Sequence, residues 1–391
     1  MKTLCLPISA FCKTGSGTTP SRNKYERYFN GSIPWVKSGE LRESIITETE
    51  ERVTEEALAE TSLKIAPKGS VLVAMYGANV GRVGILGINA TTNQAVCYLI
   101  PEKEKADSRY VFHALQQKLP EFISRSVGGA QPNISQQIIR ATKILLPPLE
   151  EQKRIAEILD RAEELRSKRR EAIAELDTLT QAIFLEMFGN PVTNPKGWQI
   201  KICKSICSRI TVGIVVQPAS YYQEYGVPAL RSQNIKENSI STDNLVFFSQ
   251  TDNETKLAKT RVKAGDVVLV RTGQPGTAAV IPEELDGVNA IDLLITTPCK
   301  DVVDSVYLCS FFNSAWGKKL VSSSQVGQIQ KHLNVGILNN AQIICPPLPL
   351  QQEFARRAET VEKLKAAHRA SLSELNALFA SLQHRAFRGE L

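Results

Sequence analysis

Two stretches of the chain carry mostly apolar residues at alternating steps of three and four. The first stretch contains Ile155, Ile158, Ala162, Leu165, Arg169, Ala172, Leu176, Leu179 and Ile183. The second contains Phe354, Arg357, Val361, Leu364, His368, Ser371, Leu375, Leu378 and Leu382. An average spacing of 3.5 residues is the heptad repeat of a coiled coil. The pattern therefore predicts two long amphipathic helices, each about 58 Å long at 1.5 Å per residue.

Proline pairs at 147–148 and 346–347 mark where these helices begin, because proline does not fit inside a helix. Each apolar stripe has a basic residue at its midpoint, Arg169 in one and His368 in the other. The stripes could belong to two solvated helices that tolerate a polar position. We instead expect an antiparallel coiled coil whose register the central polar residues fix, because two separate helices would leave both stripes exposed.

The two helical segments are copies of one another. Between residues 143 and 189, thirteen positions are identical to the position 199 residues later, where about three would match by chance. The segments before them also correspond, with offsets that drift from 194 to 197. Insertions therefore collect in the segments before the helices, while the helices keep a constant register.

The repeat predicts a globular domain followed by a helix, twice. Short apolar runs between glycines, at 71–75 and 267–271, indicate buried strands in both globular segments. We expect an α+β fold with two pseudo-repeated, mixed α/β globular domains at 1–146 and 191–345. The helices would occupy 147–190 and 346–391.

Composition is that of an ordinary globular protein, with 391 residues, 42% of them hydrophobic. No apolar run approaches the roughly 18 residues that span a bilayer, and the first residues are too short an apolar stretch for a secretion signal. The eight cysteines contain no C-x-x-C pair. We therefore expect a reduced, cytoplasmic protein with no membrane partner.

The net charge of +7 is concentrated in the globular segments. Residues 1–146 hold 18 basic and 13 acidic groups, and residues 191–346 hold 15 and 12. A basic surplus is compatible with a polyanion such as DNA, although many proteins without such a partner reach the same value.

The chain carries no recognisable catalytic motif. Its four histidines lack the spacing of metal ligands, which argues against a metal site. The sequence has no nucleotide-binding loop, no nucleophile elbow and no Asn-Pro-Pro-aromatic motif of an amino-methyltransferase. We therefore predict that the chain is not an enzyme.

The order of two divergent domains, each followed by Pro-Pro-Leu, a glutamine and a heptad helix, resembles a type I restriction-modification specificity subunit. The segments 18–22, 33–36, 128–135 and 387–391 resemble the same family. The resemblance implies two target recognition domains that read an asymmetric, bipartite site on double-stranded DNA. It also implies that the paired helices form a spacer that docks two methyltransferase subunits.

The family also supplies expectations about cofactors and further partners. This chain should bind no cofactor, while the methyltransferase subunits use S-adenosylmethionine. Restriction subunits, which use ATP with Mg²⁺ to translocate and cleave DNA, would join the same complex.

Polar loop residues are the candidates for DNA contact, because hydroxyls and lysines suit phosphate while Asn, Gln and Arg suit base edges. In the first domain they are Lys13, Thr19, Ser21, Arg22, Lys37, Ser38, Tyr76, Asn79, Arg82, Gln131 and Asn133. In the second domain they are Tyr221, Tyr222, Arg231, Gln233, Asn234, Arg271, Thr272, Gln274, Gln330, Lys331 and His332.

Several other interpretations remain open at this stage. Any one of these residues could be a solvated loop residue, and Gln131 with Asn133 could organise a turn. Trp35 lies among apolar neighbours, which favours a core position over base stacking. At the level of function, the alternatives are a structural coiled-coil adaptor that binds proteins, and a nuclease with its own active site in a variable domain.

Overall fold

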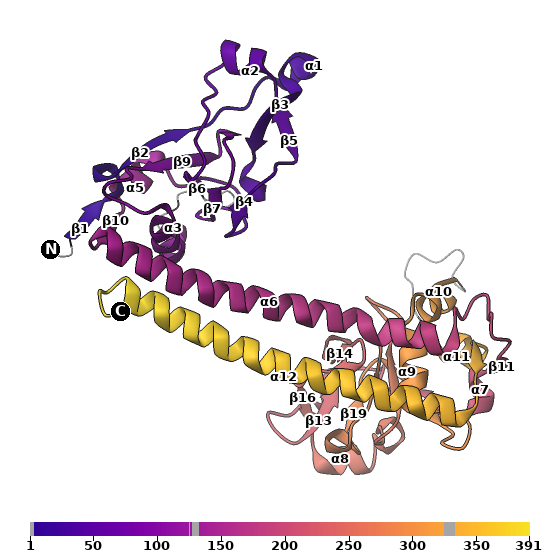
Figure 1. Cartoon of the computed structure of the whole chain (residues 1–391). Coiled ribbons are helices and arrows are strands. Elements are labelled where there is room, and N and C mark those ends of the chain that lie inside the picture. Colours follow the sequence, from indigo (N-terminus) through magenta and orange to yellow (C-terminus); the bar gives the residue numbers. More distant parts are fainter. Residues whose placement is uncertain (1–3, 125, 127–132, 324–332) are drawn as a thin grey trace. The chain divides into compact units, whose positions relative to one another are not determined.

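The computed structural model describes residues 4–124, 126, 133–323 and 333–391. The chain divides into two compact units. The first unit comprises Met1–Arg170 and Ala370–Leu391, and the second comprises Glu171–Arg369. Each unit contains one globular domain and parts of both long helices (Figure 1).

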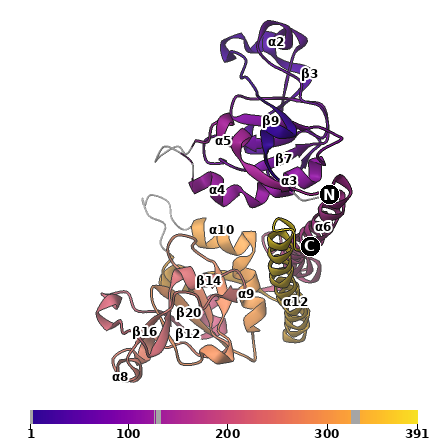
Figure 2. The ribbon, with the colours of Figure 1, turned by 90° about the vertical axis from the view of Figure 1, so that its left-hand side faces the viewer.

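The larger sheet of the first unit has five strands, in the order β2-β9-β6-β7-β4. Their bounds are Cys12–Ser16, Val96–Pro101, Val71–Ala74, Val83–Leu86 and Ile45–Ile46. Helix α3, Ser108–Gln117, lies against this sheet, as Figure 2 shows. One hydrophobic core joins α3, the sheet and the beginning of the first long helix.

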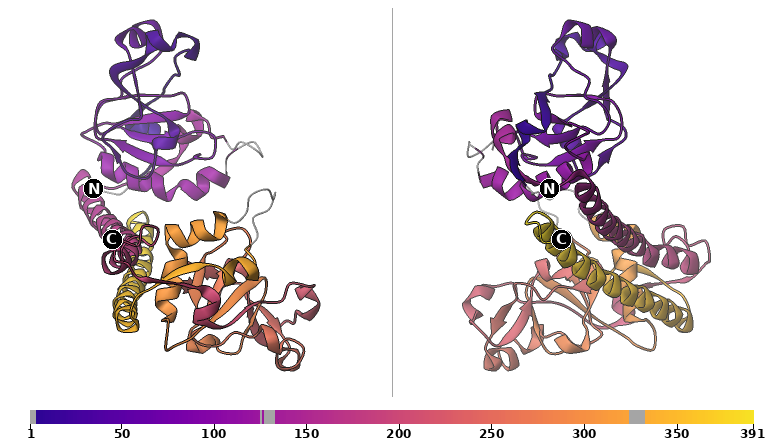
Figure 3. Two further views of the ribbon diagram at one scale, coloured as in Figure 1. Left: turned by 90° about the vertical axis from the view of Figure 1, so that its right-hand side faces the viewer. Right: turned by 60° about the vertical axis from the view of Figure 1, so that its left-hand side comes forward.

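A smaller three-stranded sheet completes this domain, with strands β5 (Glu51–Val53), β3 (Phe29–Val36) and β8 (Thr91–Thr92). Strands β3 and β8 run parallel, while β3 and β5 run antiparallel. The indigo lobe that contains this sheet projects beyond the five-stranded sheet in both views of Figure 3.

The second unit repeats this plan. Its larger sheet has the order β12-β20-β17-β18, and its smaller sheet has the order β16-β13-β19. The bounds of these strands are Cys207–Val212, Leu293–Pro298, Val267–Val270, Ala278–Val280, Val246–Phe248, Val227–Leu230 and Asn289–Ala290. The smaller sheet again combines a parallel pair, β13 with β19, and an antiparallel pair, β13 with β16. The sequence repeat is therefore also a repeat of the fold.

Each globular domain closes with a two-stranded antiparallel sheet just before its long helix. Strand β1 (Leu4–Pro7) pairs with β10 (Lys143–Leu146), and β11 (Gln199–Ile202) pairs with β21 (Gln342–Cys345). The remaining helices are α1 (Tyr25–Tyr28), α2 (Glu55–Glu60), α4 (Leu119–Ser124), α5 (Gln136–Ala141), α7 (Cys203–Ile206), α8 (Gln250–Glu254), α9 (Ser305–Asn313), α10 (Ala315–Ser323) and α11 (Val335–Asn339). A short hairpin joins β14 (Ile235–Lys236) to β15 (Ser239–Ile240).

The glutamine after each proline pair ties the helix to its domain. Gln152 accepts a hydrogen bond from the backbone N–H of Asp107 at 2.9 Å, and its amide donates to the carbonyl oxygens of Lys105 and Pro147. Gln351 accepts from the N–H of Asp304 at 3.0 Å and donates to the carbonyls of Val302 and Pro346. Both glutamine side chains are buried, so these bonds satisfy their amide groups inside the protein.

A tyrosine in the first turn of α3 and of α9 makes a second pair of equivalent hydrogen bonds. The hydroxyl of Tyr110 donates to the carbonyl oxygen of Leu145 at 2.6 Å. The hydroxyl of Tyr307 donates to that of Ile344 at 2.8 Å. The offset between the acceptors is again 199, so the joint between domain and helix is conserved between the two halves of the chain.

The long helices are α6, Leu149–Phe188, and α12, Leu348–Ala386. They contact each other within both units. In the first unit Arg166 donates to Asn376 and its guanidinium lies 4.3 Å from the ring centroid of Phe379. In the second unit Lys365 lies 3.0 Å from the carboxylate of Asp177.

Aromatic contacts give the direction of the second-unit pairing. Phe184 and Phe188 both lie 5.5 Å from Phe354, ring centroid to ring centroid. Because Lys365 pairs with Asp177 and the earlier Phe354 contacts the later Phe184, the two helices run antiparallel in this unit.

The buried stripe of each helix differs from the predicted seam at two positions. Leu165, Leu179, Leu364 and Leu378 are 39–50% exposed, so they lie outside the buried stripe. The predicted positions Ile158, Arg169, Leu176, His368 and Leu375 are half-buried, and Ile155 is buried. The neighbours one residue on, including Leu159, Thr180, Lys365 and Phe379, are buried instead. Several of the buried helix residues, among them Leu159 and Phe379, belong to the hydrophobic core of the first globular domain.

Candidate nucleic-acid interface

Two of the predicted basic residues in the first domain share one acidic partner. Arg22 lies 2.7 Å from the carboxylate of Glu51, and Lys37 lies 3.0 Å from it. Lys37 also lies 2.8 Å from Glu50. The hydrogen bonds from Arg22 and Lys37 outweigh burial and hold the pKa of Glu51 below its ordinary value. Glu51 therefore stays ionised and holds the two cations on the same side of the small sheet.

The Arg22 side chain also lies over an aromatic cluster. Its guanidinium carbon is 4.3 Å from the ring centroid of Phe29 and 5.6 Å from that of Trp35. Trp35 is 1% exposed, and its indole N–H donates to the carbonyl oxygen of Thr18 at 3.1 Å. The core interpretation of Trp35 is confirmed, and the ring supports Arg22 by a cation–π contact.

The other polar candidates of this face occupy turns and an exposed strand. Thr19 donates a hydrogen bond to Gln94. Ser21 precedes the 3₁₀ turn Arg22–Lys24, and Ser38 begins the 3₁₀ turn Ser38–Glu40. Lys13 is exposed on β2.

A second group lies in the loop after β6. Tyr76 forms an isolated antiparallel bridge with Asn133, which brings together two segments far apart in the chain. The backbone N–H of Arg82 donates to the carbonyl of Asn79 at 3.0 Å, which closes the turn. Burial raises the pKa of Tyr76 above its ordinary value. Gln131, predicted for the same group, lies outside the described residues.

The second domain places Arg271 and Thr272 around one carboxylate. Arg271 lies 2.6 Å from Asp292, and Thr272 donates to the other oxygen of this carboxylate at 3.4 Å. The Nε of Arg271 donates to the carbonyl of Leu333 at 3.1 Å. Gln274 is exposed at the end of the same loop. Gln330, Lys331 and His332 lie outside the described residues.

Asn234 does not fit the predicted role of reading bases. It is 1% exposed, its side-chain oxygen accepts from the N–H of Arg231, and its amide donates to the carbonyls of Ser241 and Asp243. These bonds stabilise the turn. Because they occupy both the oxygen and the nitrogen of the Asn234 side chain, the amide is not available to a DNA base. Arg231 itself donates to the carbonyl of Asn244, whereas Gln233 in the same turn is exposed.

Exposed apolar residues in the second domain were missed by the sequence analysis. Val216 is 79% exposed and Tyr225 is 81% exposed. Gly17 and Gly213 precede the matching segments of the two domains, and at each a Cβ atom would overlap a backbone oxygen of the neighbouring small-sheet segment. The segments therefore leave the sheet at equivalent places, one bearing Thr19 and Arg22 and the other Val216 and Tyr225.

The predicted pair Tyr221 and Tyr222 lies at the same end of the second domain. Their ring centroids are 6.2 and 6.1 Å from that of the buried Phe248. Tyr222 is 37% exposed, so part of this residue is accessible to solvent.

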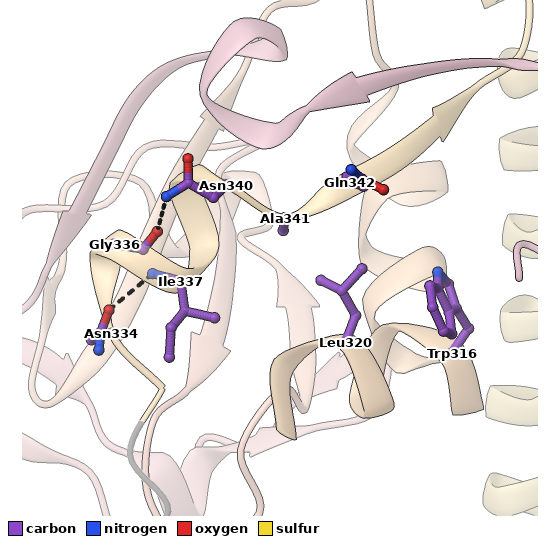
Figure 4. Close-up of a pocket in the computed structure, with 8 residues that line it drawn as sticks. All are labelled: Trp316, Leu320, Asn334, Gly336, Ile337, Asn340, Ala341 and Gln342. Atoms are coloured by element: carbon purple, nitrogen blue, oxygen red, sulfur yellow. Dashed lines mark hydrogen bonds between the residues drawn. The ribbon is translucent and has the colours of Figure 1, made fainter. Parts of the chain in front are cut away.

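A surface cavity of about 590 Å³ lies elsewhere in the second domain, between α10, α11 and β21. Figure 4 shows Trp316 and Leu320 of α10 on one side and Ile337 of α11 on the other. Asn334 caps α11 by accepting from the N–H of Ile337 at 2.9 Å. Its lining includes none of the described residues predicted to contact DNA.

The described part of the chain offers little for metal chemistry or membrane insertion. It contains no group of three or more His, Cys, Asp or Glu residues placed to hold a metal ion. Among the same residues, no helix is long and apolar enough to cross a membrane.

Comparison with known proteins identifies the architecture. Residues 7–176 match the family model described as "Type I restriction modification DNA specificity domain". The MjaIX specificity subunit of Methanocaldococcus jannaschii is 25% identical over 371 residues, which cover 88% of this chain and 82% of that protein. The EcoBI specificity subunit of Escherichia coli is 24% identical over 333 residues, which cover 77% of this chain and 69% of that protein.

The chain is similar to type I restriction-modification specificity subunits over most of its length. The S subunit of a type I system from M. genitalium has the same fold, with a TM-score of 0.64 at 13% identity over 99% of this chain and 96% of that one. A second chain, solved in work on the complex assembly and conformational transition of the type I R-M system, has a TM-score of 0.62 at 18% identity. The match covers 100% of this chain and 98% of that one. The predicted α+β fold is confirmed, whereas the coiled-coil pairing over the full helix length stays a prediction.

The predicted contact residues divide into local groups. In the first domain Arg22 and Lys37 meet at Glu51, and Tyr76 meets Asn133. In the second domain Arg271 and Thr272 meet at Asp292. The sheets beneath these groups follow a similar plan in both domains, but the exposed side chains differ.

Proposed function

We propose that this chain is the DNA-reading subunit of a type I restriction-modification complex, with one globular domain reading each half of an asymmetric site. Specificity subunits are the non-catalytic, DNA-recognising members of such systems. The observation that carries the proposal is the combination of a matched scaffold and unmatched loops. The Gln152 and Gln351 ties are the same, while a cation cluster at Arg22 stands where the second domain exposes Val216 and Tyr225.

Different exposed groups favour different bases. A guanidinium suits the acceptor edge of guanine or a phosphate, whereas an exposed tyrosine ring suits stacking or a thymine methyl group. Two domains with these surfaces should read two different half-sites.

The long helices provide the spacing. We propose that α6 and α12 pair antiparallel along their length and hold the two recognition domains a fixed distance apart. The matched contacts Arg166–Asn376 and Lys365–Asp177 support this arrangement, because each lies 199 residues from its counterpart on the other helix. Bases between the half-sites would then remain unread.

The chemistry would come from partners. We propose that two methyltransferase subunits dock on the spacer helices and use S-adenosylmethionine to methylate a flipped adenine in each half-site. Restriction subunits that use ATP and Mg²⁺ would bind the same complex. Its place of action would be the cytoplasm, where it meets chromosomal DNA.

A domain exchange tests the proposal. Residues 4–146 are replaced by the first domain of another family member, the chimaera is co-expressed with its methyltransferase, and methylated adenines are mapped by sequencing. Only one half of the recognised site should change. The matched control replaces residues 191–345 and should change only the other half. A change in both halves from a single exchange would contradict independent reading.

Salt dependence separates DNA recognition from a structural adaptor that binds proteins. Each phosphate neutralised contributes a slope of about −0.9 to the logarithm of DNA affinity against the logarithm of salt. The purified complex should therefore show a steep slope on its own site. Retention that does not depend on salt, with no site preference, would favour the adaptor.

A further inference from the structure

The two halves of the chain differ where each domain meets the long helices. In the first unit, His113 of α3 and Phe379 of α12 fill this space, with ring centroids 6.4 Å apart. His113 is 1% exposed and its Nε2 lies 2.7 Å from the carboxylate of Asp160 on α6. Two rings thus occupy the angle between α3, α6 and α12.

The repeat gives the matching positions in the second unit. The offset of 197 that relates Asp107 to Asp304 relates His113 to Ser310. The helix offset of 199 relates Phe379 to Thr180. Both rings are therefore replaced by small side chains that carry one hydroxyl each.

The smaller side chains leave a cavity. A volume of about 190 Å³ lies between α6, α9 and α12, with Thr180, Val280, Val306, Cys309, Ser310 and Ala358 in its lining. All of these residues belong to the second unit. Burial raises the pKa of the Cys309 thiol to about 12, so this group stays neutral.

Two polar groups of the lining are not satisfied. Thr180 is 6% exposed and Ser310 is 4% exposed. Neither hydroxyl oxygen has a hydrogen-bond partner among the described residues. A buried hydroxyl without a partner is unfavourable, so a molecule that forms a hydrogen bond with it would gain affinity.

We propose that this cavity binds a small, neutral aromatic molecule that carries one hydrogen-bonding group, of about the size of phenol. Such a molecule would occupy the volume that the His113 and Phe379 rings fill in the first unit. An apolar cavity of about 150 Å³ is known to accept benzene, so the volume is sufficient. The hydroxyls of Thr180 and Ser310 would select a ligand with a polar group.

Charge argues for a neutral ligand. Glu359 and Glu362 also line the cavity, but Glu359 lies 2.7 Å from Lys363 and Glu362 lies 2.8 Å from Lys365. With both carboxylates already paired, a charged ligand would lose hydration without gaining a free counter-charge. The bound molecule would stiffen the joint between the second domain and the helices.

Ligand-observed NMR and a calorimetric titration of the full chain with phenol test the proposal, with benzene as the comparison probe. We expect one phenol site per chain, and an affinity for benzene at least several-fold lower. The double variant Thr180→Phe with Ser310→His rebuilds the two rings of the first unit. It should lose phenol binding by at least tenfold.

A second variant covers the case in which the filled protein does not fold. Thr180→Val with Ser310→Ala keeps the volume and removes both hydroxyls, so phenol and benzene should bind equally well. Absence of phenol binding to the unaltered chain would overturn the proposal and assign the cavity to water. Equal phenol binding by the unaltered chain and the correctly folded filled variant would overturn it as well.

Discussion

Lys365 of α12 lies 3.0 Å from the carboxylate of Asp177 on α6, although its side chain is only 8% exposed. Burial by itself would lower the pKa of Lys365, but hydrogen bonds from its ammonium to Glu362 and Asp177 outweigh burial and raise that pKa. Arg166, 199 residues earlier, makes the corresponding contact with Asn376. Cations at equivalent positions therefore join the helices in both units.

Replacing Asp177 by alanine should destabilise the second unit. The variant leaves the buried Lys365 with Glu362 as its remaining acidic partner, and because Asp177 is half exposed we expect a loss of about 1 kcal/mol. Urea denaturation measures the change. Asp177→Asn is the matched control, because Asn376 occupies the equivalent position, and it should cost less than half as much. Equal losses for both variants would show that the hydrogen bond contributes nothing.

The glutamine ties should be more costly to remove. Gln152→Ala leaves the N–H of Asp107 and the carbonyl groups of Lys105 and Pro147 without this partner, so we expect a loss of about 2–3 kcal/mol. Gln351→Ala should cost a similar amount in the second unit. Denaturant midpoints check both, and the exposed Gln352→Ala provides a control that should change little. If Gln152→Ala or Gln351→Ala were as stable as this control, the hydrogen bonds of that glutamine would not stabilise the contact between domain and helix.

Stability of the first unit should depend on pH through His113. Burial lowers its pKa from about 6.5 to about 4, so the folded protein holds the ring neutral while the unfolded chain takes up a proton. This contribution is complete above pH 6.5 and is lost as pH falls from 6.5 towards 4. We expect a loss of about 1–3 kcal/mol over this window.

Comparison with His113→Gln isolates this effect from the carboxylates that also titrate at acid pH. The variant keeps a donor for Asp160 but has no ring to protonate. Its stability should fall less steeply between pH 6.5 and 4. Identical slopes for the two proteins would show that His113 does not resist protonation.

Tyr225 should contribute to DNA affinity in the second half-site only. Tyr225→Ala should weaken binding by about 1–3 kcal/mol if the ring stacks on a base. Fluorescence anisotropy of the methyltransferase complex on its own site measures the loss, and the same site with its second half scrambled is the control. The variant and the unaltered complex should bind the scrambled site equally. A loss that persists there would point to a general role in folding or docking.

The sequence could predict what repeats and what is periodic. The 199-residue offset located both joints, and the 3.5-residue spacing located both helices at 149–188 and 348–386. The same spacing placed Leu165 and Leu378 in the seam, although both are exposed. Periodicity alone does not show which side of a helix a globular domain covers. The buried Lys365 was missed because its counter-charge, Asp177, comes from a distant segment.

The interface was harder to predict because residue type does not reveal burial. Asn234 has the right chemistry for adenine but uses its amide to hold a turn. Val216 and Tyr225 were passed over because apolar side chains are expected in the core, yet they are 79% and 81% exposed. Each error arose where tertiary packing decided the environment.

Mapping methylated adenines after lengthening the helices tests the central claim most directly. Matched insertions of four residues, one after Ala172 in α6 and one after Ser371 in α12, extend the spacer by about 6 Å at 1.5 Å per residue. Since duplex DNA rises about 3.4 Å per base pair, the gap between the half-sites should grow by one or two base pairs while the bases of both halves stay the same. A constant gap with altered bases in either half would contradict the account of two readers on a helical spacer.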